Sequence, residues 1–332
     1  MQPPAGEGPY FDDLAVGQEF RAAPGITLTS GLAAAHQAIT GDRLAIALDH
    51  QLCYEVTDGD RLAPPGLVWD VAIGQSTVVT QHVRANLFYR GLAFRRLPRL
   101  GDTMRTATSV VALRQNRPRD GRAPTGLAVL RISTTDQEGR PVLDFRRCAM
   151  LPLRDAGRQT GHADDLDSAG QQVRTADLAH LVRGWRLARF ARQAAGPRHG
   201  DMRPGVTFEV AGGDVVTSAP ELARLTLNIA MVHHDSAAAG GERLVYGGHA
   251  IGLALAQAAR ALPSIVTVVG WHGCDHLGPV HEGDTLRSTV TVEQADPLPS
   301  GDGSLVHLRS RVRADRPEPA DVLDWRYVAV MA

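Results

Sequence analysis

The stretch LTLNIAMVHHDSAAAGGERLVYGGHAIGLALA, residues 225–256, carries the pattern that decides the fold. An Asn and a His stand five residues apart, as Asn228 and His233, and a Tyr-Gly-Gly-His corner follows at 246–249. The corner opens an apolar segment that predicts a helix over 250–262. A polar pair aimed at a glycine-led helix start is suited to moving a proton beside a developing negative charge.

The frame around this stretch occurs twice in the chain. Gly-Asp-Thr at 101–103 returns at 283–285, an offset of 182 residues that also pairs Gly66 with Gly248. A further matched pair, at an offset of 180, is VLDFRRCAML (142–151) and VLDWRYVAVM (322–331). Because several matches fall in nearly one register, they predict an internal duplication.

Each copy has the same predicted order of elements. An apolar helix, over 67–78 in the first copy and 250–262 in the second, precedes Val- and Thr-rich runs typical of strands. One central helix followed by long strands is an α+β pattern, and the sheet must wrap the helix to cover it. Two copies predict a built-in pseudo-dimer with sites at the seam between the halves.

The duplication predicts three regions. Residues 1–153 form the first unit, 154–203 a linker, and 204–332 the second unit. Apolar residues at roughly helical spacing predict an amphipathic helix over 177–192 within the linker.

Composition excludes several classes of function. The 332 residues have a net charge of -1, which offers no basis for a nucleic-acid partner, and no apolar run is long enough to span a membrane. All 35 basic residues are Arg, which excludes Schiff-base chemistry on Lys. Three widely spaced cysteines and an N-terminus without signal-peptide features predict reduced thiols and a cytoplasmic location.

These features together resemble the hot-dog fold and its MaoC-like branch, the type 2 enoyl-CoA hydratases. The segments AITGDRLAI (38–46), LNIAMVH (227–233) and RLVYGGH (243–249) are most similar to mesaconyl-CoA hydratases, also called β-methylmalyl-CoA dehydratases. The resemblance implies a double hot-dog, in which each half wraps an antiparallel sheet around a central helix. It also implies that water is added across, or removed to form, the α,β double bond of an enoyl-CoA such as mesaconyl-CoA.

The family motif, (S/T)GDxNPxH, is divided unevenly between the copies. The first copy keeps Thr40-Gly41-Asp42 but has Ala47 at the position of the His. The second copy has His233 but carries Asn228 at the position of the Asp. The resemblance therefore implies a catalytic second half and a first half that shapes the acyl pocket.

Three residues are the catalytic candidates. We expect His233 to act as general acid and base, and Asn228, which cannot transfer protons, to hold the reacting water. The alternative for Asn228 is a cap of the local turn. The resemblance places the Gly248 N–H against the thioester oxygen, and a helix N-terminus suits that role.

Other residues near these motifs are expected to contact substrate or to support the site. The substrate-binding candidates are Tyr246, Gly247, His249, Asp235, Asp42 and Arg43. The alternatives are packing or capping for His249, orientation of an imidazole for Asp235, and a structural turn for Asp42 and Arg43. For the WHGCDH run at 271–276 a surface edge is favoured, and the alternative is that Asp275 or His276 lines the pocket.

The expected partner is an acyl-CoA, with no metal or redox cofactor. His-His-Asp at 233–235 lacks a further ligand at a zinc spacing. A homo-oligomer, dimeric or higher, is expected from the family. Two other functions stay open: a hot-dog acyl-CoA thioesterase and a non-catalytic acyl-CoA-binding protein.

Overall fold

The computed structural model describes residues 6–59, 61–166 and 173–332. Within these ranges, twelve strands form one antiparallel sheet in the order β1-β4-β5-β6-β3-β9-β12-β11-β10-β7, with β2 beside β4 and β8 beside β10. The strands of the first half are β1 Glu19–Phe20, β2 Ile26–Thr27, β3 Ala85–Phe94, β4 Thr103–Gln115, β5 Thr125–Thr135 and β6 Pro141–Pro152. Those of the second half are β7 Thr207–Glu209, β8 Asp214–Val215, β9 Ile265–His276, β10 Thr285–Pro297, β11 Ser304–Asp315 and β12 Ala320–Met331.

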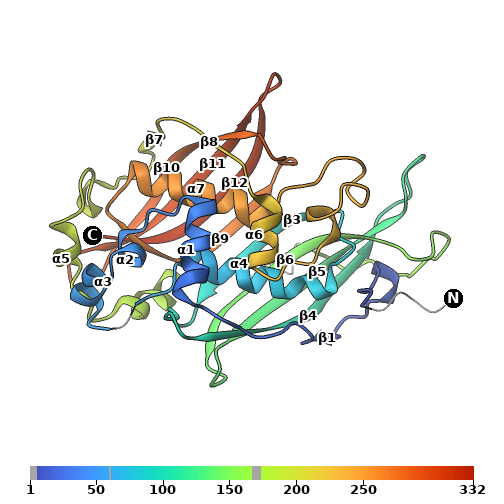
Figure 1. Ribbon diagram of the computed structural model, residues 1–332, viewed down its shortest axis with the longest axis horizontal. Coiled ribbons are helices and arrows are strands. Elements are labelled where there is room, and N and C mark those ends of the chain that lie inside the picture. Colours follow the sequence, from blue (N-terminus) through green and yellow to red (C-terminus); the bar gives the residue numbers. More distant parts are fainter. Residues whose placement is uncertain (1–5, 60, 167–172) are drawn as a thin grey trace.

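Helices cover one face of the sheet, and the two central helices pack against each other in the middle of the molecule (Figure 1). The α-helices are α1 Ser30–Thr40, α2 Ala45–Leu48, α3 His50–Thr57, α4 Pro65–Gln75, α5 Leu187–Ala191, α6 Ala219–Leu225 and α7 Gly247–Ala261. Short 3₁₀ turns are η1 Phe11–Asp13, η2 Ser76–Val79, η3 Thr175–Asp177, η4 Ala179–Val182, η5 His199–Asp201 and η6 Met231–His233. The predicted central helices are confirmed as α4 and α7, and every residue of α4 is buried.

The two halves join where β3 pairs with β9, and we call this pairing the seam. Phe88 lies opposite Asp275, and Ala93 lies opposite Gly270. Adding the 182-residue offset to Phe88 gives Gly270, and subtracting it from Asp275 gives Ala93. The two pairs therefore exchange under the duplication, so the seam is a local two-fold and the predicted pseudo-dimer is confirmed.

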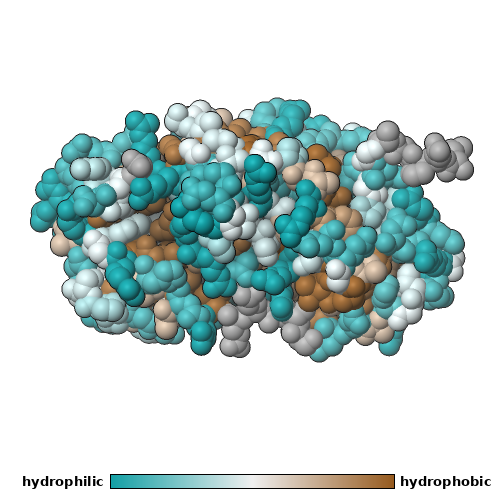
Figure 2. Space-filling view, turned by 90° about the horizontal axis from the view of Figure 1, so that it is seen from below, coloured by the Kyte–Doolittle hydropathy of each residue, from teal (hydrophilic) through white to brown (hydrophobic). Residues whose placement is uncertain are grey.

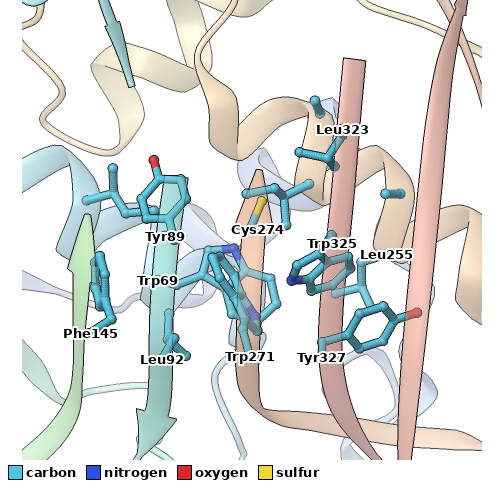
Figure 3. Packing of buried hydrophobic residues seen from close by; sticks show 14 of the residues in the cluster. Trp69, Tyr89, Leu92, Phe145, Leu255, Trp271, Cys274, Leu323, Trp325 and Tyr327 are labelled. Carbon is cyan, nitrogen blue, oxygen red and sulfur yellow. The ribbon is translucent and has the colours of Figure 1, made fainter. Parts of the chain in front are cut away.

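Aromatic rings fill the core beneath the seam (Figure 3). Trp69 on α4 packs edge-on against Trp271 on β9, with ring centroids 4.9 Å apart, and Trp325 on β12 lies 5.6 Å from Trp271. Tyr89 on β3 contacts Trp271 from the other half at 5.8 Å. Because these rings come from both halves, one hydrophobic core spans the duplication.

The continuous helix predicted over 177–192 is wrong. The segment forms η3, η4 and the short helix α5, and Gly184, with φ of 81°, interrupts it. A left-handed glycine turns the chain out of a helical path. The apolar side chains are nevertheless buried, as expected, and include Leu178 and Phe190. Residues 167–172 of the predicted linker lie outside the described residues, and the unit boundaries at 153 and 203 stay predictions.

The surface is mainly hydrophilic on the face shown in Figure 2, where hydrophobic residues show mostly in recesses between hydrophilic ones. No helix in the described part of the chain is both long and apolar enough to cross a membrane.

Candidate functional site

A cavity of about 370 Å³ lies at the seam, and we call it the seam cavity. The first half contributes the end of α4, the segment from Val83 to Tyr89, and Arg147 on β6. The second half contributes Asn228, η6, the segment 244–247 and the end of β9. The predicted site thus forms between the halves, and neither half could build it alone.

Asn228 enters the cavity from a tight turn after α6. Leu227 adopts a left-handed conformation with φ of 60°, and the Asn228 N–H donates to the Ala223 carbonyl at 2.9 Å. The Asn228 Oδ1 accepts from the Ala230 N–H at 3.0 Å, so the residue caps its own turn. The structural alternative for Asn228 therefore holds, and the same side chain also lines the cavity.

The first half repeats this turn, but its Asp42 does not line the seam cavity. Gly41 has φ of 69°, and Asp42 Oδ1 accepts from the Leu44 N–H at 3.0 Å. The sequences of the two turns align position for position, with Asp42 at the place of Asn228. Ile46, the neighbour of Ala47, is buried in an apolar cluster with Phe190 of the linker. Ala47 itself, at the position of the His, is partly buried against the central hydrophobic core.

His233 is half-buried in the wall of the seam cavity, at the end of η6. Its Nδ1 lies 2.9 Å from the Leu244 carbonyl oxygen, so Nδ1 must carry a proton and donate it. Nε2 then holds the lone pair. Desolvation lowers the pKa of His233 to about 4, with smaller contributions from the nearby His234 and Arg147. At neutral pH the ring is an uncharged base.

The glycine corner lies at the N-terminus of α7. The N–H groups of Gly247 and Gly248 fall in the first turn, where a helix offers no internal acceptor. Gly247 lines the cavity, whereas Gly248 is buried beside it. A Cβ on Gly248 would stand 2.0 Å from Asp70 Oδ1 and 2.6 Å from the Tyr246 ring, so only glycine fits.

Tyr246 connects this corner to a buried carboxylate of the other half. Its hydroxyl donates to Asp70 Oδ1 at 3.1 Å, and His36 Nε2 lies 2.9 Å from Asp70 Oδ2. Burial raises the pKa of Asp70, and its bonds to His36 and Tyr246 oppose that rise. Nothing in the sequence pattern singled out His36 or Asp70, because they lie 34 residues apart and meet only in the fold.

Two further cavity residues were missed or misplaced by sequence reasoning. His276, expected at a surface edge, lies in the cavity wall with its ring against Gly247, and desolvation lowers its pKa to about 4. Its neighbour Asp275 pairs instead with Arg90 at 2.6 Å. Tyr89 also lines the cavity. At the 182-residue offset its counterpart is Trp271, a pairing that does not indicate a pocket.

The remaining predicted residues lie away from the cavity. Asp235 is exposed and accepts from the Ala237 N–H, so the expectation that it orients an imidazole is wrong. The neighbouring rings are held by carbonyls: Leu244 for His233, and Asn228 for His234 at 2.7 Å.

The other three supporting candidates have structural surroundings. His249 is fully buried and does not reach the cavity, which fits a packing role. Asp42 caps its turn, and Arg43 beside it is exposed. In the described residues no group of three His, Cys, Asp or Glu side chains is arranged to hold a metal ion.

Comparison with known proteins places this architecture. No family model matches the chain. The Mycobacterium tuberculosis protein RV0216 is described as a conserved hypothetical protein with a double hotdog fold, essential for bacterial survival during infection. It is 52% identical, with a TM-score of 0.90 over 98% of this chain and 99% of that one.

Two curated enzymes match over most of their length. A β-methylmalyl-CoA dehydratase from Chloroflexus aurantiacus is 27% identical over 98% of this chain and 97% of its own. A mesaconyl-CoA hydratase from Cereibacter sphaeroides is 26% identical over 90% and 87%. The curated homologues of this chain are thus a CoA-ester dehydratase and a CoA-ester hydratase, and its fold is the double hot-dog described for RV0216.

The double hot-dog predicted from the sequence is thereby confirmed. A solved structure of a putative MaoC domain protein dehydratase from Chloroflexus aurantiacus shares the fold at a TM-score of 0.85 and 24% identity, over 99% of both chains. The roles of the individual site residues in this double hot-dog protein stay predictions.

Proposed function

We propose that this protein is an acyl-CoA hydratase or dehydratase that acts on the α,β double bond of an enoyl-CoA. One observation carries the proposal: the uncharged His233, its Nδ1 anchored to a carbonyl, stands in a cavity that also holds the N-terminus of α7. A fixed base beside free backbone N–H groups supplies both requirements of the reaction, proton transfer and stabilisation of an enolate-like oxygen.

The steps follow from this arrangement. Water, held by Asn228, loses a proton to His233 Nε2 as its oxygen bonds to the β-carbon. The electron pair of the double bond moves onto the α-carbon and the thioester oxygen, where N–H groups at the corner 247–248 stabilise it. His233 then returns a proton to the α-carbon. Dehydration is the reverse, and no metal or redox cofactor enters the proposed sequence of steps.

Asn86 supports binding of the pantetheine arm. It lines the cavity, and both atoms of its amide are buried without a hydrogen-bond partner among the described residues. Pantetheine carries two amides that could satisfy such a group. By the names of the curated relatives, the favoured acyl group is short, branched and dicarboxylic. A homo-oligomer and a cytoplasmic location stay predictions.

A thioesterase is the less favoured function. Hot-dog thioesterases use a carboxylate as base or nucleophile, and the residues lining the seam cavity include no Asp or Glu among those described. Release of free thiol from an enoyl-CoA would reveal this activity, because hydration leaves the thioester intact.

His233→Ala tests the mechanism. Loss of the general base should lower kcat/KM for mesaconyl-CoA hydration by about 10²- to 10⁴-fold, measured by the decay of enoyl absorbance. His50→Ala, at an exposed position of α3, is the control and should keep full activity.

Two outcomes would contradict the proposal. If a correctly folded His233→Ala variant keeps activity within a few-fold of the parent, His233 is not the base. If the parent binds acyl-CoA but neither hydrates nor hydrolyses it, the protein is the non-catalytic binder.

A further inference from the structure

Arg147 is a buried cation in the wall of the seam cavity. It lies on β6, and its side chain is only 3% exposed. Its Nη2 donates to Thr80 Oγ1 at 2.7 Å and to the Ser76 carbonyl at 3.3 Å. Both acceptors are uncharged, so the guanidinium is held in place but its charge is not neutralised.

No carboxylate pairs with Arg147 among the described residues. Its Nε–H is buried and has no acceptor in the described part of the chain. Other half-buried arginines near the seam are paired, as Arg90 is with Asp275 and Arg96 with Asp102 and Asp136. A buried, permanently charged group without a partner is unfavourable unless something else supplies the anion.

The side chains around Arg147 add no negative charge. Desolvation keeps His233 and His276 uncharged at neutral pH by lowering both pKa values to about 4, and it raises the pKa of Tyr89 and Tyr246. Desolvation also lowers the pKa of Arg147 itself, but a guanidinium remains protonated in proteins. The cavity therefore carries an uncompensated positive charge beside its candidate base.

Comparing the two halves of the duplication shows that only one of them has an arginine at this position. At the 180-residue offset the counterpart of Arg147 is Tyr327, which is buried, stacks on Trp325 at 3.8 Å, and lies 3.3 Å from the Ser310 hydroxyl. The seam cavity, which contains His233, has the arginine. The equivalent place in the other half of the duplication, where the His is replaced by Ala47, has the uncharged ring of Tyr327. A purely structural role in the sheet would not require this difference.

We propose that Arg147 binds a carboxylate at the distal end of the acyl group and so determines specificity for a dicarboxylic acyl-CoA. The proposal rests on the seam cavity being the acyl-CoA site of the proposed function. A carboxylate fits because it can accept from two N–H groups of the guanidinium fork at once. The relatives' names point to a class of substrate, whereas the unpaired guanidinium identifies the residue that would select it.

Binding of saturated analogues tests the proposal without requiring turnover. Succinyl-CoA and butyryl-CoA differ in that a methyl group replaces the distal carboxylate, and their affinities are measured by calorimetry. The parent should prefer succinyl-CoA by at least about thirtyfold, the effect of one desolvated charge pair. Arg147→Met should abolish the preference by weakening only succinyl-CoA binding. Arg147→Lys, which keeps the charge without the fork, should restore part of it.

The matched control is Arg146→Met. Arg146 neighbours Arg147 on the same strand, points to the opposite face of the sheet, and does not line the cavity. This variant removes the same charge from the same element and should keep the parent's preference. A loss of preference in Arg146→Met would mean that overall charge, not the Arg147 site, selects the ligand.

Turnover separates this proposal from the proposed function. Mesaconyl-CoA and tiglyl-CoA, which carries a methyl group in place of the distal carboxylate, give the corresponding ratio of kcat/KM. If both substrates are hydrated with equal efficiency and neither analogue is preferred, the role of Arg147 is overturned but the hydratase function stands. If succinyl-CoA is bound selectively but nothing is hydrated, the hydratase function is overturned and the role of Arg147 stands. Because the parent's own preference decides the matter, a variant that fails to fold does not block the test.

Discussion

At the scale of single residues, the site depends on how one imidazole is held. The Leu244 carbonyl fixes the proton of His233 on Nδ1, so the orientation of the base is set by backbone and no carboxylate partner is needed. An Asp at position 228 would place a negative charge in the same cavity. Asn228 supplies hydrogen bonds there without that charge, which leaves the ring uncharged over a wide range of pH.

The pH dependence of the reaction should follow from this. His233 acts as a base only when unprotonated, so kcat/KM should stay level as the pH falls from 8 and decline only near its pKa of about 4. Asn228→Asp keeps the acceptor for the Ala230 N–H but adds a charge that favours the imidazolium. The decline of kcat/KM on the acidic side of the pH profile, its acidic limb, should therefore move to a pH about one unit or more higher.

Asp42→Asn is the matched control for this shift. It changes the equivalent position of the half that lacks the His and keeps the acceptor for the Leu44 N–H. The limb should not move in this variant. An unmoved limb in Asn228→Asp would show that the side chain at 228 does not face His233.

At the scale of elements, the starts of α4 and α7 allow a direct comparison. A Cβ on Gly248 would stand 2.0 Å from Asp70, whereas one on the equivalent Gly66 would stand 3.2 Å from His36. Gly248→Ala should therefore destabilise the protein by about 1–3 kcal/mol or more and reduce kcat by displacing the helix start. Gly66→Ala should have a smaller effect on urea unfolding and on kcat. Equal effects would mean that the corner at 247–248 has no special part in the reaction.

The elements also show which features of the fold and the site could be predicted from the sequence. The central helices, the duplication and the turn at Asn228 follow from local patterns of apolar residues, glycines and repeated triplets. The helix over 177–192 was mispredicted because Gly184 breaks it while its apolar side chains still find burial. Arg147 and Tyr89 were not predicted as parts of the cavity, and His276 was only the less favoured alternative, because their roles depend on which strands meet at the seam. That information is carried by pairings between distant segments.

At the scale of the whole molecule, histidines with desolvated rings should reduce stability in acid. Desolvation lowers the pKa of His233, His249 and His276 from 6.5 to about 4. Between these values the unfolded chain binds protons that the folded chain does not. Stability is therefore full above pH 6.5 and is lost as the pH falls toward 4, by up to about 1.4 kcal/mol per pH unit for each histidine.

Urea unfolding at a series of pH values measures this loss. His249→Leu should make the acid dependence less steep, because one histidine fewer takes up a proton on unfolding. Both ring nitrogens of His249 lack a partner among the described residues, so the substitution leaves no polar group stranded. An unchanged slope in this variant would show that His249 is already protonated, or solvated, in the folded protein.

The local two-fold at the seam has a consequence for how such a site can change over time. In an assembly of two identical chains, every substitution occurs in both sites, so a cation that helps one is imposed on the other. When one gene encodes both halves, Tyr327 and Arg147 can be substituted independently of each other, as can Ala47 and His233. A joined chain can therefore keep the His and the cation in one site while the other site has neither.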